Sequence, residues 1–483
     1  MLLTSIFLIL IISILAIFLT NANNLSLLRF TSLTSSSLVL IFSSILITQF
    51  DNSVYHFQNV LTYSMGSNVL NFVYSFGLDG ISLFFFFLSS LLIFLCILFV
   101  WNDHLFKEYV LNLLLIELFL LIIFSVLDLF LFYVFFEAIL IPMYLMIGIW
   151  GSRERKIRAV YLFFFYTLCG SILMLLGILY IYSVAGTLNF EYLLTWQFSE
   201  TEQLLLWLAF FISFASKIPM FPFHIWLPEA HVEAPTVGSV LLAGILLKLG
   251  VYGFLRFSIT LFPDASFFFS PLVYLLSILG VLYASMTAIR QTDLKRIIAY
   301  SSIAHMNLVT LGIFSFNILG LEGAILQSIS HGFVSGGMFL LVGIAYNRYH
   351  SRFLYYYGGL VHLMPVYAAL FLIFTMANIA LPGTSSFVGE FLLLIGVFKV
   401  NVVLCVVSAL GVILCGAYSL WLYNRVIFGN LKITYTKNFS DVNIREFCVF
   451  IPLLFFVFYM GIFPSFFSSF LHLACCSLSF ISV

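Results

Sequence analysis

The stretch Leu204-Leu-Leu-Trp-Leu-Ala-Phe-Phe-Ile-Ser-Phe-Ala-Ser-Lys217-Ile-Pro219-Met-Phe-Pro222 decides the fold of this chain. It is apolar over a length that suits a lipid bilayer, and it carries one lysine. An ammonium group near the middle of a bilayer costs roughly 2.5–3.5 kcal/mol on insertion scales. Because one substitution would remove that cost, we expect Lys217 to have a function inside the membrane.

The composition of the whole chain points the same way. Of its 483 residues, 63% are hydrophobic and 8% are charged, and the mean hydropathy is +1.18. No water-soluble domain has this balance, so we predict an all-α polytopic membrane protein surrounded by a lipid bilayer. The formal net charge of zero says nothing about partners, because the charges stand in short loops and a few sites within the membrane. No stretch resembles a nucleic-acid-binding patch, so we expect no nucleic-acid partner.

The seven cysteines do not indicate a metal or redox centre. They stand mostly in apolar runs, none forms a Cys-x-x-Cys pair, and no Cys/His cluster has the spacing of a metal site. We interpret them as small apolar residues, and we expect neither a metal nor a cofactor in this chain.

Fourteen apolar segments come near the ~20 residues that a membrane helix requires. They lie at residues 2–20, 28–48, 81–101, 110–127, 129–149, 159–185, 204–222, 237–257, 270–290, 297–316, 322–346, 366–395, 400–425 and 447–470. The first lacks the basic flank of a secretory signal, so it is expected to be a membrane helix. No linker separates the segments, which predicts a single transmembrane domain over residues 1–483.

The basic residues predict the orientation. Most lysines and arginines fall in the loops between helices 1/2, 3/4, 5/6, 9/10, 11/12 and 13/14, whereas the opposite side holds Arg256 and Lys399. The positive-inside rule then places both termini outside. The 59 phenylalanines favour an AT-rich organellar genome. We therefore expect the mitochondrial inner membrane, with the basic loops in the matrix and both termini in the intermembrane space.

Two of the expected helices are interrupted by proline. Pro219 and Pro222 lie in helix 7, and Pro382 and Gly383 lie at the centre of helix 12. Proline lacks a backbone donor, and broken backbone at membrane depth is tolerated where protein or a watery cavity satisfies it. These four residues are candidate hinges. The plainer alternative is that the prolines only kink the helices.

The spacing of the interruptions predicts internal symmetry. Helices 7 and 12 are five apart, as in two repeats of five helices, and an odd number makes the repeats inverted. The repeats would cover residues 110–257 (helices 4–8) and 270–425 (helices 9–13). Residues 1–109 and 426–483 would be flanking helices.

Ionisable residues at membrane depth are the candidate site. Glu137 is the only charge in helix 5, and Lys217 is its expected partner, because a buried carboxylate needs a neighbour to stay ionised. A Glu–Lys pair that opens and closes is a natural proton gate. Lys248 lies too deep in helix 8 to reach the membrane surface and is expected to relay protons. The alternative for the pair is a static contact that fixes packing.

Three further residues extend this series. His305 and His331 stand inside helices 10 and 11 among hydroxyls and amides, and histidine can pass a proton through either ring nitrogen. Each could also be a satisfied core residue. Glu390 lies beyond the break in helix 12, a position that suits the last proton donor or acceptor. Its alternative is an ion pair with a neighbour.

Three other residues complete the candidates. Glu117 and Glu137 stand at similar depth on either side of the turn near Asp128, so we hypothesise that they share a proton. His224 and His231 lie in the loop between helices 7 and 8. They could guide protons toward Lys217, or the loop could simply cap helix 8. Their spacing does not suit a metal site.

Four motifs resemble those of the antiporter-like subunits of respiratory complex I. They are Phe135-Phe-Glu-Ala-Ile-Leu-Ile-Pro142, Lys217-Ile-Pro-Met-Phe-Pro-Phe-His-Ile-Trp-Leu-Pro-Glu-Ala-His-Val-Glu-Ala-Pro-Thr236, Leu247-Lys-Leu-Gly-Val-Tyr-Gly253 and Asp293-Leu-Lys-Arg-Ile-Ile-Ala-Tyr-Ser-Ser302. The similarity runs through helices 4–13. The long motif that begins at Lys217 is the most specific.

The resemblance implies a role and a set of partners. It implies that Glu137, Lys217, Lys248, His305, His331 and Glu390 form a hydrophilic axis that carries protons. Glu390 fits the antiporter-like subunit that has glutamate where the other two, subunits 2 and 5, have lysine. Those two subunits are the expected neighbours. NADH, FMN, iron–sulfur clusters and ubiquinone would belong to partner subunits, since this chain has no dinucleotide fingerprint and no cluster cysteines.

Two alternatives remain for the function. A subunit of a multisubunit sodium/proton antiporter would share the same motifs but would be driven by ion gradients. A solute carrier fits less well, because its site should gather several donors in one polar cavity. A purely structural scaffold would not need Lys248 or Glu390.

Overall fold

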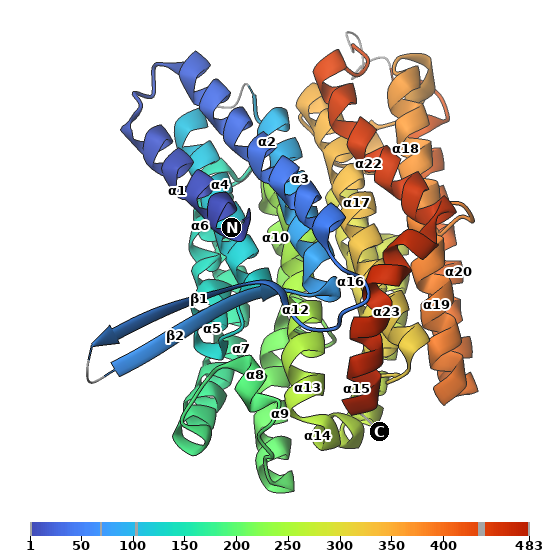
Figure 1. Cartoon of the computed structure of the whole chain (residues 1–483). Coiled ribbons are helices and arrows are strands. Elements are labelled where there is room, and N and C mark those ends of the chain that lie inside the picture. Colours follow the sequence, from blue (N-terminus) through green and yellow to red (C-terminus); the bar gives the residue numbers. More distant parts are fainter. Residues whose placement is uncertain (1, 68–69, 102–104, 433–439, 482–483) are drawn as a thin grey trace.

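The protein is a bundle of membrane-spanning helices (Figure 1). This computed structural model describes residues 2–67, 70–101, 105–432 and 440–481. Within these residues, eleven helices are long and apolar enough to cross a membrane. The chain is therefore a multi-pass membrane protein, as its composition predicts.

The helices follow the expected segments closely. The first half contains α1 (Leu2–Leu19), α2 (Leu25–Gln49), α3 (Gly80–Phe99), α4 (Phe106–Ser125), α5 (Leu129–Ala138), α6 (Leu140–Trp150), α7 (Lys156–Ala185), α8 (Phe190–Leu193), α9 (Glu200–Lys217), α10 (Trp226–Glu233), α11 (Thr236–Leu241), α12 (Leu247–Gly253), α13 (Ile259–Leu261) and α14 (Pro263–Phe268). The second half contains α15 (Ser270–Arg290), α16 (Leu294–Ile313), α17 (Ile318–Tyr349), α18 (Pro365–Asn378), α19 (Ser385–Val400), α20 (Val402–Ile427), α22 (Ile444–Ile462) and α23 (Pro464–Ile481).

The structure confirms the predicted helical membrane fold and adds a β-hairpin that the sequence analysis did not predict. Strands β1 (Gln58–Ser67) and β2 (Leu70–Leu78) pair antiparallel, with Leu61 opposite Phe76 and Gly66 opposite Asn71. Figure 1 shows the hairpin projecting sideways from the bundle. The segment is rich in valine, tyrosine and phenylalanine, which favour strands. Hydropathy alone could not reveal it, because the segment is too polar for a membrane helix.

Both helix breaks that the prolines predict, in the expected segments 204–222 and 366–395, are present. α9 ends at Lys217 and α10 begins at Trp226, with Pro219 and Pro222 between them. Likewise, α18 ends at Asn378 and α19 begins at Ser385, with Pro382 and Gly383 between them. Proline cannot donate to the helical ladder, so each helix stops next to its prolines.

The last expected helix, at 447–470, is wrong as a single element. α22 ends at Ile462, and α23 starts at Pro464 as a separate helix. Proline suits the first turn of a new helix because the missing donor would be unpaired there anyway. A smaller break separates α5 from α6 at Ile139, where Pro142 cannot donate to the carbonyl four residues earlier.

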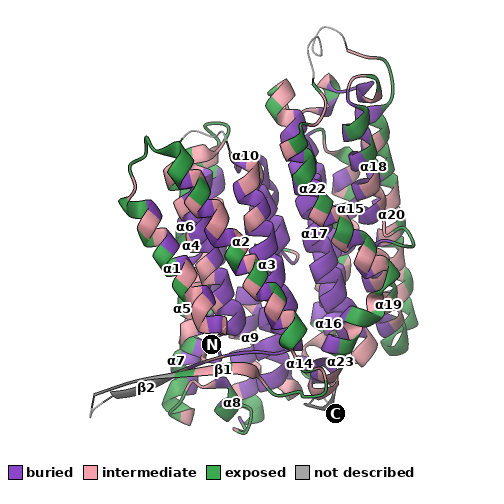
Figure 2. Ribbon diagram, turned by 45° about the horizontal axis from the view of Figure 1, so that its top comes forward, coloured by how far each residue is buried: buried purple, intermediate pink, exposed green. Residues whose placement is uncertain are grey.

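The helix expected over residues 237–257 is irregular in a way that hydropathy does not predict. Two π-helical turns, η1 (Leu242–Leu246) and η2 (Phe254–Ser258), flank α12. Such turns occur often at functional sites. Figure 2 shows that α3, α16 and α17 form the buried centre, whereas α1, α7 and α20 expose side chains on the outside. Residues 237–261, which contain these irregular turns, are all buried.

Candidate functional site

Lys248 lies at the centre of the bundle and contacts His331. The Lys248 Nζ donates a hydrogen bond to the carbonyl oxygen of Ala243, within the η1 turn, and lies 2.8 Å from His331 Nδ1. Both side chains are buried. The ammonium group has therefore found polar partners inside the protein, as a charge at membrane depth requires.

Close packing of two helices makes this contact. A Cβ atom at Gly332 would lie 3.1 Å from the carbonyl oxygen of Gly244 and 2.7 Å from the Leu88 side chain. Glycine therefore lets α17 approach η1, which places His331 beside Lys248.

His305 continues the series on α16. Its ring centroid lies 5.8 Å from that of His331, and its Nδ1 lies 3.0 Å from Glu390 Oε1. The same carboxylate oxygen accepts a hydrogen bond of 2.9 Å from Gln327 Nε2. The structure thus brings Lys248, His331, His305 and Glu390 together, from four helical segments that are distant in sequence.

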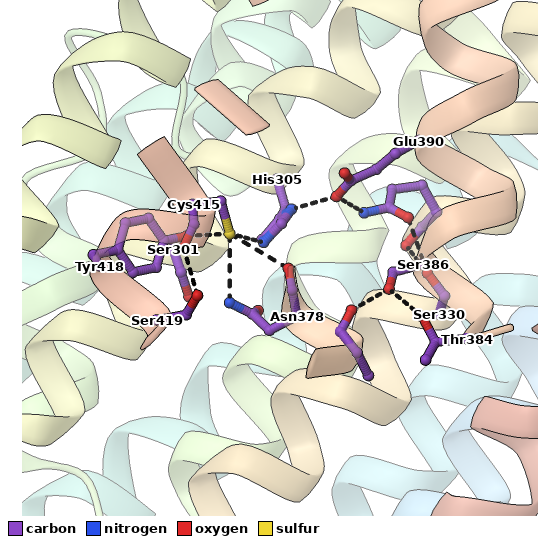
Figure 3. A network of polar contacts seen from close by, with 12 residues as sticks. Ser301, His305, Ser330, Asn378, Thr384, Ser386, Glu390, Cys415, Tyr418 and Ser419 are labelled. Atoms are coloured by element: carbon purple, nitrogen blue, oxygen red, sulfur yellow. Dashed lines mark hydrogen bonds and ion pairs between the residues drawn. The ribbon is translucent and has the colours of Figure 1, made fainter. Parts of the chain in front are cut away.

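The second ring nitrogen of His305, Nε2, contacts the thiol of Cys415. Figure 3 shows Cys415 between His305, Tyr418 and Asn378. The Cys415 Sγ lies 3.6 Å from His305 Nε2 and accepts a hydrogen bond of 2.9 Å from the Tyr418 hydroxyl. Sequence patterns gave no signal for this group, because its members come from three helices.

Lys217 and Glu137 interact electrostatically but do not touch each other. Among the described residues, no ion pair within 4.0 Å joins them, and both Glu137 carboxylate oxygens lack a hydrogen-bond partner. The Lys217 Nζ instead lies 4.5 Å from the centroid of the Phe136 ring, in a cation–π contact. The expected pair is therefore not in direct contact in this structure.

The remaining candidates are buried, and their contacts are mostly apolar. Glu117 is fully buried in α4, with both carboxylate oxygens unpartnered among the described residues, and no contact joins it to Glu137. The His231 ring stacks on Phe339 at 4.7 Å and lies within electrostatic reach of Lys248. His224 packs between the rings of Phe221 and Tyr283.

Sequence reasoning missed a buried charge cluster at the basic-loop end. Arg352 lies in the loop after α17, is 1% exposed, and pairs with Glu233 at 2.9 Å and Asp293 at 3.0 Å. Burial raises the pKa of Asp293, and Arg352 acts in the opposite direction. Nearby, Lys295 Nζ donates 2.7 Å to the carbonyl of Ala234. This cluster fixes the segment after α10 against the start of α16.

The arrangement can move protons but offers no obvious place for a metal. Lysine, histidine and carboxylate groups all gain and lose protons, and the links Lys248–His331 and His305–Glu390 are at hydrogen-bond distance. Across the described residues, no group of three His, Cys, Asp or Glu side chains could hold a metal ion.

Comparisons with known proteins identify the family of this chain. Residues 126–415 match the family described as NADH:quinone oxidoreductase/Mrp antiporter, TM. The NADH-ubiquinone oxidoreductase chain 4 of Chondrus crispus is 53% identical over 439 residues, which cover 90% of this chain and 89% of the relative.

Two solved structures share the fold over the whole chain. A chain of respiratory complex I from Thermus thermophilus, solved with bound NADH, aligns with a TM-score of 0.88 at 30% identity, and each chain is covered completely. A chain of the Mrp complex from Dietzia sp. DQ12-45-1b aligns with a TM-score of 0.85 at 19% identity, covering 100% of this chain and 99% of that one. The second likeness concerns the fold alone.

Proposed function

The chain belongs to the NADH:quinone oxidoreductase/Mrp antiporter family, and we propose that it is the proton-carrying chain 4 subunit of NADH:ubiquinone oxidoreductase, respiratory complex I. As part of that enzyme it couples NADH oxidation and ubiquinone reduction to proton transfer across the membrane. The observation that carries this proposal is the buried series Lys248–His331–His305–Glu390.

The proton path has a gate and a relay. Lys217 and Glu137 form the gate, supported by their electrostatic interaction without a direct ion pair. When the pair opens, Lys217 passes a proton toward Lys248. The proton then moves through His331 and His305 to Glu390. Each transfer is driven by the charge that appears or disappears on the neighbouring group.

Three residues outside this series have auxiliary roles in the proposal. His231 lies within electrostatic reach of Lys295 and Lys248, so it serves proton uptake, together with His224 from the segment between α9 and α10. Glu117 exchanges a proton with Glu137 when the gate moves. The two helix breaks act as hinges that let α9 and α10, and α18 and α19, move relative to each other when nearby groups change charge. The hinge residues are Pro219, Pro222, Pro382 and Gly383.

The surroundings follow from the same role. The subunit lies in the mitochondrial inner membrane, with its basic loops in the matrix and its termini in the intermembrane space. Subunits 2 and 5 are its neighbours within the complex. FMN, iron–sulfur clusters, NADH and ubiquinone bind to other subunits. Residues 110–257 and 270–425 are the two inverted repeats of the transport unit.

A sodium/proton antiporter is the second candidate. The likeness to the Mrp complex favours it, but at 19% identity that likeness concerns the fold, whereas chain 4 relatives are 53% identical. A native gel of solubilised membranes, stained for NADH dehydrogenase and followed by mass spectrometry, separates the two. A large NADH-oxidising band that contains this chain supports complex I. A smaller assembly without NADH activity would reject it.

The relay itself is tested by Lys248→Met and Glu390→Gln in the assembled complex. Each removes a titratable group from the path, so NADH-driven proton pumping should fall on the order of 100-fold. Lys399→Met is the matched control, because Lys399 is exposed on the same helix as Glu390. Normal pumping by both relay variants in a fully assembled complex would refute the relay.

A further inference from the structure

Cys415 contacts His305 on the nitrogen that faces away from Glu390. The imidazole Nδ1 lies 3.0 Å from Glu390 Oε1, so Nε2 is the nitrogen left for another partner. The Cys415 Sγ lies 3.6 Å from that Nε2. Both side chains are buried, so their partners must come from the protein.

The thiol has two alternative acceptors for its single proton. One is His305 Nε2, and the other is the carbonyl oxygen of Asn378, 3.4 Å from the sulfur. The sulfur also accepts from the Tyr418 hydroxyl at 2.9 Å and from Asn378 Nδ2 at 3.6 Å. Figure 3 shows the thiol at the centre of these contacts.

These contacts suit a histidine that changes its charge. When His305 is neutral and Nδ1–H points to Glu390, Nε2 needs a donor, and the Cys415 S–H supplies it. When His305 is protonated, Nε2–H needs an acceptor, and the sulfur accepts while its own proton turns to Asn378. An N–H bond forms at Nε2 with the proton that the relay delivers to His305. Otherwise only hydrogen bonds change, and the thiol keeps its own proton throughout.

We propose that Cys415 is a positioning residue that satisfies His305 Nε2 in both of its protonation states, with Tyr418 holding the sulfur in place. This inference rests on the proton relay proposed above and adds a residue that acts through His305. Without such a partner, one of the two states would leave a buried ring nitrogen unpaired, and that state would be disfavoured.

The choice of variants follows from the space around the thiol. A small cavity of about 10 Å³ adjoins Cys415 and is lined by His305, Glu390, Ser408 and Gly411 among others. That is near the volume that one water needs, so alanine could admit a water that replaces the thiol. Valine fills the space without any donor or acceptor, and serine keeps both.

The test compares Cys415→Val with Cys415→Ser in the assembled complex. We expect Cys415→Val to lower NADH-driven proton pumping about tenfold, the loss of one hydrogen bond to a charged group. Cys415→Ser should pump close to the unaltered rate. Cys96→Val is the control, because Cys96 is a buried thiol in α3 for which the described residues show no hydrogen bond. Equal losses in the valine and serine variants would overturn the proposal.

An infrared measurement gives a second readout that mere packing would not produce. On addition of NADH, the S–H stretching band of Cys415 should shift, and Tyr418→Phe should move the same band at rest. The band is assigned by its absence in Cys415→Ser and its persistence in Cys96→Val. This measurement does not use Cys415→Val, so it can be made even if that variant fails to assemble. A band that ignores both NADH and the Tyr418→Phe change would also overturn the proposal.

The Glu390→Gln variant separates the two levels of the argument. If Glu390→Gln stops pumping while Cys415→Val pumps normally, the relay stands and the role of Cys415 is rejected. If Glu390→Gln pumps normally, the relay fails at its last residue, and the inference about Cys415 fails with it.

Discussion

At the scale of single residues, some buried charged groups form close ion pairs, whereas others have only weak contacts. Arg352 is enclosed by Glu233 and Asp293, which form a static cluster. Lys217 rests on an aromatic ring, and the Glu137 carboxylate has no hydrogen-bond partner among the described residues. A group held by strong partners resists titration, whereas one with weak partners can gain or lose a proton as its surroundings change.

The Arg352 cluster leads to a prediction about stability. Arg352→Met should destabilise the subunit by about 3–5 kcal/mol, because it leaves two carboxylates buried without their cation. Arg296→Met is the matched control, since the Arg296–Glu229 pair is about one-third exposed and such pairs contribute ~0–1 kcal/mol. The measurement is the amount of full-size complex on native gels and its resistance to heat. Equal accumulation of the two variants would contradict the assignment.

At the scale of elements, hydropathy predicted the helices well and their irregularities only where proline marks them. Pro219 and Pro382 predicted two helix breaks, and both are present. The β-hairpin and the η1 turn have no such marker. The length of an apolar segment indicates whether it can span a bilayer. A π turn depends instead on how the segment that contains η1 packs against its neighbours.

The candidate site shows the same division. Glu390 and Lys248 could be chosen from the sequence because a charge in an apolar run is conspicuous. Cys415 and Gln327 could not, because a thiol and an amide are unremarkable in such runs. Their importance comes from contacts with His305 and Glu390, across long separations in sequence.

The packing of α17 on η1 leads to a prediction about geometry. Gly332→Ala should push the two segments apart, because the added Cβ would lie 3.1 Å from the backbone oxygen of Gly244. The 2.8 Å contact between His331 and Lys248 should then lengthen, and proton pumping should fall several-fold, by about 1 kcal/mol or more.

Gly148→Ala is the control for that change. A Cβ at Gly148 would meet nothing within 4 Å, and alanine favours the helix that contains it. Pumping by this variant should match the unaltered complex. If Gly332→Ala also pumps normally, close approach at Gly332 is not what sets the contact between Lys248 and His331.

At the scale of the whole molecule, different helices of one bundle carry the proposed gate and the proposed relay. Glu137 and Lys217 are carried by α5 and α9, whereas His305 and Glu390 are carried by α16 and α19. The buried segment of residues 237–261, which contains Lys248, lies between the two sets in sequence. Protons that pass both sets must therefore pass them one after the other.

This serial arrangement makes the last prediction. Glu137→Gln and Lys248→Met should each reduce pumping, and the double variant should be little worse than the more severe single variant, because a path already blocked at one step gains little from a second block. A double variant of Lys248→Met and Arg296→Met is the control, since Arg296 lies off the path and its small effect should simply add. The readout is the number of protons pumped per NADH oxidised. Fully multiplicative losses for Glu137→Gln and Lys248→Met would mean that the two residues serve separate routes.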